Sequence, residues 1–191
     1  KKDRMPSAKG KGKGSRRGTV SDHEAQAVNL SASEVDTLFE EVQTLLTAGH
    51  TKLATGDAAG ARKSFERARA RGLRSPSAEQ ALYVERVATC NIANALYHLG
   101  DHDACIKEHM RSLELSRKSG DEALEKKERH NVDHALELAA QSCFDKGSDA
   151  LAAGKPMDAL RWHEQGLAYG QRMSLDADRL RCERVASCIM G

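Results

Sequence analysis

The chain has 191 residues, of which 39% are hydrophobic, 30% charged and 4% aromatic, and its formal net charge is +2. This length accommodates one or two domains with a buried core, which argues against a wholly unfolded chain. Sandwiches and barrels depend on aromatic and β-branched residues, so the low aromatic content and only three prolines argue against them. The abundance of Ala, Leu, Arg, Glu and Lys instead predicts an all-α protein.

The small net charge conceals two regions of opposite sign. Residues 1–17 contain eight basic residues against Asp3 alone, whereas the rest of the chain holds 22 basic and 27 acidic residues. The first 20 residues are rich in Lys, Gly and Ser and have almost nothing to bury. We therefore expect residues 1–30 to be a basic tail, disordered unless bound, and residues 31–191 to be a helical array.

The cysteines and the apolar runs indicate the compartment. Five cysteines at irregular positions, with no CxxC pair, predict reduced thiols and hence a cytoplasmic protein. They are Cys90, Cys105, Cys143, Cys182 and Cys188. No apolar run approaches the roughly 18 residues that cross a bilayer, and the basic N-terminus lacks the apolar segment of a secretory signal. We expect no association with a membrane.

Helical periodicity begins directly after the tail. Ser31 and Glu34 have the spacing of a capping box and predict a helix that runs to Thr55. Glycine turns then separate further apolar helical runs. The expected helices cover residues 33–55, 58–71, 77–99, 102–119, 122–153 and 156–171, with a seventh at the C-terminus.

Prolines mark the start of two of these helices. Ser75 and Pro76 suit the N-cap and first position of the helix at 77–99. Pro156 likewise suits the first turn of the helix at 156–171.

The turn glycines Gly56, Gly100 and Gly154 reveal an internal repeat. When the three segments are aligned on these glycines, four offsets carry residues of matching size: small at −7, small at +5, bulky at +9 and small at +12. This pattern is typical of the tetratricopeptide repeat, a helix-turn-helix unit of about 34 residues. The aligned residues are Gly49, Ala93 and Gly147; Ala61, Cys105 and Ala159; Phe65, His109 and His163; and Ala68, Ser112 and Gly166.

The repeats are longer than this minimum and unequal in length. The turn glycines are 44 and then 54 residues apart, and the ten extra residues fall in the charged segment EALEKKERHNVDHALE. As helix, they would lengthen the third repeat's first helix by about 15 Å; a compensating loop is the alternative.

A fourth repeat is indicated at the C-terminus. The segment ERVATC at 85–90 recurs almost unchanged as ERVASC at 183–188, which aligns Gly191 with Gly49. The expected fold is therefore a right-handed α-solenoid of three full repeats plus half of a fourth. Because a solenoid buries its core between neighbouring repeats, we expect the chain to be cut from a longer array.

The segment at 99–121, LGDHDACIKEHMRSLELSRKSGD, resembles the long tetratricopeptide repeats of the LGN/Pins spindle-orientation adaptors. Kinesin light chains and several ciliary proteins have similar long repeats. The resemblance covers about residues 35–191 and is specific for the repeat class. It implies a solenoid whose first helices line a concave groove that holds peptides or partner helices.

This resemblance indicates the groove residues. The exposed positions of the first helix in the second repeat are Asn91 and Asn94, in an Asn-Ile-Ala-Asn run similar to the family's Asn-Leu-Gly-Asn. Asparagine amides can pair with the backbone of an extended peptide. The alternative is that these side chains are merely solvated. The full candidate groove comprises Thr47, His50, Asn91, Asn94, His98, Gln141, Asp145 and Ser148.

One specific version of the groove is disfavoured. Co-chaperones that bind the acidic C-termini of heat-shock proteins use a clamp of Lys, Asn, Asn, Lys and Arg side chains. The cationic positions of that clamp correspond here to Leu46, Gln141 and Asp145, and its first Asn to His50; only Asn91 is retained. Without the cations, a carboxylate has no charge-assisted partner.

Metal binding and catalysis have little support in the sequence. His98, His102, Cys105 and His109 are close in the chain but divided by a turn, and His130 and His134 flank Asn131 where a zincin motif has Glu. His109 and His163 are expected to be buried core residues. The glycines at 10–14 do not form a phosphate-binding loop, because no strand precedes them. We expect no metal, no cofactor, no small-molecule substrate and no enzymatic activity.

The basic tail has two functional interpretations and one structural one. Its cations can bind a polyanion such as RNA or the acidic surface of tubulin, and they include Lys9, Lys11, Lys13, Arg16 and Arg17. Residues 1–20 contain no aromatic residue on which a base could stack, which disfavours sequence-specific RNA recognition. Thr19 follows Arg16 and Arg17 as in a basophilic kinase site. The structural alternative is a solvated linker.

The favoured function is a non-enzymatic scaffold or adaptor that binds protein partners in its groove. A cytoskeletal setting, ciliary or microtubule-associated, is the expectation. The alternative is a ribonucleoprotein component whose tail contacts RNA phosphates.

Overall fold

The computed structural model describes residues 30–173, and these form six helices with no strand among them. The all-α prediction is therefore confirmed, and every helix end lies within one residue of its expected position. The seventh helix and the half repeat fall outside the described residues, as does the tail. The helices are α1 (Ala32–Ala54), α2 (Ala58–Gly72), α3 (Ala78–His98), α4 (His102–Ser119), α5 (Glu122–Ala152) and α6 (Pro156–Gly170).

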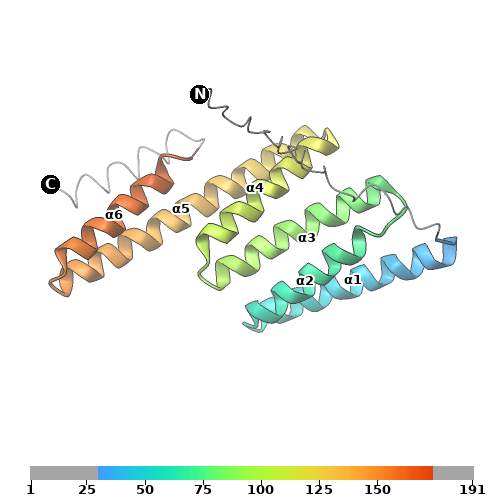
Figure 1. Ribbon diagram of the computed structural model, residues 1–191, viewed down its shortest axis with the longest axis horizontal. Coiled ribbons are helices and arrows are strands. Elements are labelled where there is room, and N and C mark those ends of the chain that lie inside the picture. Colours follow the sequence, from blue (N-terminus) through green and yellow to red (C-terminus); the bar gives the residue numbers. More distant parts are fainter. Residues whose placement is uncertain (1–29, 174–191) are drawn as a thin grey trace, which may run out of the picture.

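The helices pair into three hairpins that follow one another in a row, from α1–α2 at one end to α5–α6 at the other (Figure 1). Each helix packs against the helices that precede and follow it, and α1 and α3 touch only peripherally. The contacts are therefore made between neighbours along the chain. Within residues 30–173, no helix is both long enough and apolar enough to cross a membrane.

The three hairpin turns have the same backbone geometry. Gly56, Gly100 and Gly154 have positive φ angles of 84°, 74° and 70°, a region that favours glycine. The amide of the residue after each glycine donates to the carbonyl five residues earlier, as in a Schellman motif, at 2.8 Å, 3.1 Å and 2.9 Å respectively. The turns are thus repeated in structure as well as in sequence.

The capping box at the start of α1 is confirmed. The Ser31 hydroxyl accepts from the Glu34 amide, and the Glu34 carboxylate accepts from the Ser31 amide at 2.8 Å. Pro156 is the first residue of α6, as expected.

The expected cap of α3 was wrong. The N-cap is Ser77, whose hydroxyl accepts from the Gln80 amide at 3.3 Å. Ser75 instead closes the end of α2, because its own amide donates to the Gly72 carbonyl at 3.0 Å. Pro76 therefore precedes the helix rather than beginning it.

All twelve positions aligned by the internal repeat are buried. Their sizes are matched in pairs: an added Cβ at Gly49 would collide with the ring of Phe65, and one at Gly147 would collide with the ring of His163. In the first and third hairpins, the bulky side chain of the second helix thus fills the space left by the glycine of the first helix. His109 and His163 are core residues, as predicted, with 5% and 2% of their surface exposed.

The ten extra residues of the third repeat are helical. Helix α5 has 31 residues against 21 in α3, and it is continuous from Glu122 to Ala152. The alternative of a compensating loop is excluded. The added turns at 122–131 amount to about 15 Å of helix.

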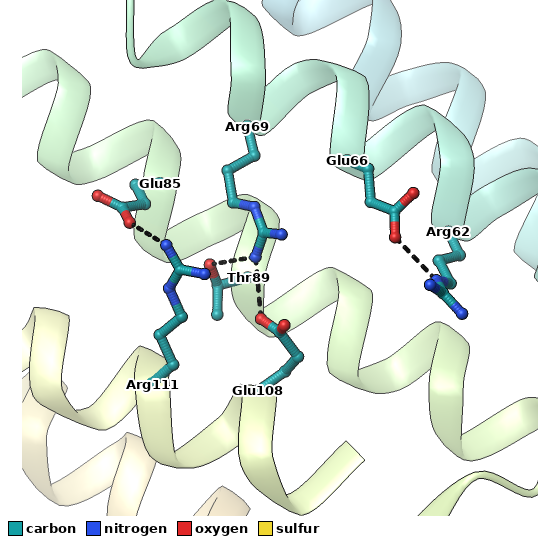
Figure 2. Close-up of polar contacts among 7 residues, drawn as sticks. All are labelled: Arg62, Glu66, Arg69, Glu85, Thr89, Glu108 and Arg111. Atoms are coloured by element: carbon teal, nitrogen blue, oxygen red, sulfur yellow. Dashed lines mark hydrogen bonds and ion pairs between the residues drawn. The ribbon is translucent and has the colours of Figure 1, made fainter. Parts of the chain in front are cut away.

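Polar contacts join consecutive hairpins. Arg69 on α2 donates to Glu108 on α4 at 2.9 Å and lies 3.5 Å from the Thr89 hydroxyl on α3 (Figure 2). On the other side of the second hairpin, the Tyr169 hydroxyl on α6 donates to the Asp103 carboxylate on α4 at 2.8 Å.

Candidate functional site

The eight predicted groove residues all lie on the first helices of the hairpins. They are spaced by three or four positions within α1, α3 and α5, so those on one helix share a face. Seven are exposed, and Asn91 is half-buried. Side chains on these faces are therefore accessible to a partner.

An open cavity of about 590 Å³ brings three of the eight together: His98, Gln141 and Asp145. It lies where the end of α3 and the start of α4 face the second half of α5. The other lining residues are Tyr97, His102, Leu138, Ser142, Lys146 and Asp149. The remaining five predicted residues do not line this cavity.

The cavity combines fixed charges with neutral donors and acceptors. The Gln141 amide donates to the Asp145 carboxylate at 2.8 Å, which orients both side chains. Burial lowers the pKa of His102, and nearby Lys146 lowers it further, so the imidazole is neutral at pH 7. Asp145 and Asp149 then outweigh Lys146, and the cavity carries a net negative charge.

The five other groove residues have different surroundings. Within the described part of the chain, the side-chain amides of Asn91 and Asn94 make no hydrogen bond, whereas the Ser148 hydroxyl donates to the Phe144 carbonyl at 3.0 Å. His50 packs against the Phe65 ring at a centroid distance of 5.3 Å. Thr47 is exposed on the turn of α1 before His50.

The structure adds a reason why a heat-shock carboxylate clamp is unsuitable here. Leu46, at the first cationic position of that clamp, is 6% exposed and belongs to the core. A lysine at this position would have to bury its ammonium group, at a high cost in free energy.

A second cluster was not anticipated from the sequence. Cys90 on α3, His109 on α4 and Glu128 on α5 place a thiol, an imidazole nitrogen and a carboxylate oxygen within 4.8 Å of one another. These are all metal-ligand side chains. No sequence pattern indicates this grouping, because the three residues come from three helices and follow no metal-binding spacing.

The cluster is mostly buried, and burial shifts the pKa of both Cys90 and His109. Burial, followed by the charge of Glu128, raises the pKa of Cys90 to about 11. Burial lowers the pKa of His109, which favours the neutral imidazole. Nδ1 of His109 is buried and has no hydrogen-bond partner among the described residues.

Two polar side chains contact the carboxylate of this cluster. The Asn131 amide donates to one oxygen of Glu128 at 3.0 Å and lies 3.9 Å from the Cys90 sulfur. The Arg86 guanidinium lies 3.5 Å from the other oxygen. Both contacts orient Glu128 relative to Cys90.

The other histidines considered in the sequence do not join this cluster. His130 and His134 stack on the exposed surface of α5 with ring centroids 6.5 Å apart. His98 and His102 line the cavity described above. The predicted tail residues Lys9, Lys11, Lys13, Arg16, Arg17 and Thr19 lie outside the described residues.

Comparisons of this chain with protein-family models, with curated proteins and with solved structures found no match. The class of protein to which this chain belongs is therefore proposed from its internal repeat.

Proposed function

We propose that this chain is a tetratricopeptide-repeat scaffold that acts without catalysis and binds protein partners through the faces of its first helices. The observation that carries the proposal is the burial of all twelve repeat-aligned positions, together with three turns of equal geometry. A solenoid of this class buries its side chains between neighbouring helices and presents an extended surface to partners.

The groove proposal rests on accessible polar side chains in register. Asn91, Asn94 and His98 follow one another at intervals of three and four residues on α3, and the two amides have no side-chain hydrogen bond within residues 30–173. Such amides can pair with both the N–H and the C=O groups of an extended peptide. Because the adjoining cavity is net negative, we infer a peptide that carries Lys or Arg side chains.

Peptide selection on the immobilised chain tests the groove. A displayed random-peptide library should enrich basic sequences, and the Asn91→Ala plus Asn94→Ala variant should bind them at least about tenfold more weakly. A matched control, Lys107→Ala plus Glu114→Ala, changes two exposed residues of α4 and should bind as the unmodified chain does. Equal binding by all three proteins, with helicity unchanged by circular dichroism, would contradict the groove.

The tail extends the proposal to an anionic partner. We propose a cytoplasmic, microtubule-associated or ciliary setting, in which the basic tail contacts an acidic surface such as that of tubulin. Pull-down with tubulin and with RNA across a salt series separates this setting from the ribonucleoprotein alternative. Deletion of residues 1–17 should abolish the interaction with tubulin. If the shortened chain still binds both tubulin and RNA as the full chain does, the tail has no role in either interaction.

A further inference from the structure

The second hairpin differs from the first and third at two core positions. Cys90, ten residues before its turn glycine, occupies the position held by Leu46 and Phe144 in the other hairpins. Both of those are buried core residues. His109 occupies the position of Phe65 and His163. Of the three hairpins that the structure describes, the second alone has both a cysteine and a histidine at these two positions.

The added turns of α5 bring a carboxylate to the same place. Glu128 lies within residues 122–131, the part of α5 that has no counterpart in α3, and only 1% of its surface is exposed. A carboxylate buried this deeply loses its hydration, and its nearest cation in the structure is Arg86, at 3.5 Å. Within residues 30–173, Arg86 is the one ion-pair partner of this carboxylate, and 3.5 Å is longer than the roughly 2.7–2.9 Å of a strong charge-assisted hydrogen bond.

His109 supplies a nitrogen atom that could bind a metal and that has no hydrogen-bond partner within residues 30–173. It is 5% exposed, and its Nδ1 makes no hydrogen bond among the described residues. An unpaired polar nitrogen is unfavourable in a buried position, because it has lost its hydrogen bonds to water. A ligand that accepts this nitrogen's lone pair would remove the cost.

We propose that Cys90, His109 and Glu128 bind one divalent transition-metal ion of the zinc type. A thiolate, an imidazole and a carboxylate form a donor set that zinc accepts, with a solvent water as the fourth ligand. Bonds of about 2.0–2.3 Å place the donor atoms of a tetrahedral site roughly 3.3–3.8 Å apart. The three ligand atoms lie within 4.8 Å of one another, so binding requires them to move closer together around the ion.

The charges and the neighbouring contacts are compatible with this ion. The thiol proton is released to solvent on binding, and the thiolate and carboxylate then offset the two charges of the metal, with the Arg86 guanidinium remaining beside Glu128. Asn131 would act as an orienting residue, because it already contacts both the Glu128 carboxylate and the Cys90 sulfur. The metal would tie the added turns of α5 to α3 and α4.

Metal binding by the full chain tests the site directly. After dialysis against Zn²⁺ under reducing conditions, mass spectrometry should find one equivalent of bound zinc. Co²⁺ as the probe should give a thiolate-to-cobalt charge-transfer band. Cys90→Ser should abolish this band, and His109→Gln or Glu128→Gln should weaken zinc affinity by at least about tenfold.

Two buried residues provide matched controls. His163→Gln alters the equivalent histidine of the third hairpin, and Cys143→Ser alters another buried thiol. Both variants should retain the metal, as should a chain carrying Cys182→Ser with Cys188→Ser. Circular dichroism checks that each variant is folded, and Cys90→Ala replaces Cys90→Ser if the latter is not.

Three results would overturn the proposal. The first is the absence of bound zinc in the unmodified chain, with no rise in its thermal midpoint when Zn²⁺ is added. The second is a charge-transfer band that persists without Cys90. The third is loss of the metal on removal of His130 and His134, which would assign binding to the exposed pair on α5.

Discussion

Arg69 on α2 and Glu108 on α4 form an ion pair of 2.9 Å that bridges the first two hairpins, with Thr89 of α3 beside it (Figure 2). Each side chain is only 20% exposed, so water screens this pair less than a fully exposed one. Because the two residues are 39 positions apart, the pair fixes how one hairpin sits on the next.

A double-mutant cycle with Arg69→Ala and Glu108→Ala should therefore give a coupling free energy of about 1 kcal/mol in urea unfolding. The control is the pair Arg62–Glu66 within α2, which has a similar distance of 2.8 Å but side chains that are 45% and 38% exposed. Its coupling should be only about 0.3–0.5 kcal/mol. Equal couplings would show that the bridge between hairpins adds nothing beyond a surface pair.

The close approach of α5 and α6 makes Gly147 sensitive to substitution. A methyl group at this position would collide with the His163 ring, which is 2% exposed and cannot move into solvent. We expect Gly147→Ala to lower the free energy of unfolding by about 1–3 kcal/mol, despite the better helix propensity of alanine. Asp149→Ala, on the exposed surface of the same helix, should change it by no more than about 0.5 kcal/mol.

The third hairpin turn lacks a side-chain cap that the other two have. Asp57 and Asp101 accept hydrogen bonds from the amides of Gly60 and Ala104, whereas the N-cap of α6 is Lys155, which makes none. Lys155→Asp should raise the free energy of unfolding by about 1 kcal/mol, because it supplies the cap and places a negative charge at a helix N-terminus. Lys155→Ala only removes the cation and should raise the free energy of unfolding by a smaller amount. An equal increase for the two variants would show that the introduced aspartate forms no new cap.

Stability should depend on pH through His102. Because burial and Lys146 lower its pKa, against the opposing effect of Asp101 and Asp103, the unfolded chain takes up a proton at a higher pH than the folded chain. The free energy of unfolding therefore decreases as pH falls from the unfolded value of about 6.5 toward the lower folded value. We expect the free energy of unfolding, measured in urea, to fall less between about pH 7.5 and 5.5 in the His102→Gln variant than in the unmodified chain. His130→Gln, on the exposed surface of α5, should leave it unchanged.

The helices and turns were predictable because their determinants are local. The capping box of Ser31 and Glu34 and the three turn glycines act within a few residues of themselves, so spacing alone gave the helix ends to within one residue. The cap of α3 was mistaken because Ser75 and Ser77 flank Pro76 and either hydroxyl suits an N-cap. The structure assigns Ser75 to the end of α2 instead.

The candidate sites were predictable only in part. The resemblance to tetratricopeptide repeats indicated groove residues on α1, α3 and α5, of which seven are exposed and Asn91 is half-buried, and the repeat register identified His109 and His163 as core residues. It did not indicate that His98, Gln141 and Asp145 share one cavity, since this depends on how α5 lies against the turn between α3 and α4.

The sequence by itself determined an all-α chain whose hairpins repeat the same turn and the same matched pairs of small and bulky residues. Those features follow from helix periodicity, capping and the conformational freedom of glycine, all of which act over short distances along the chain. Only the tertiary structure decided that the ten extra residues of α5 continue the helix and bring Glu128 to Cys90 and His109. The proximity of these three side chains depends on how three helices pack, because the spacing of residues along the sequence does not determine the distance between side chains on different helices.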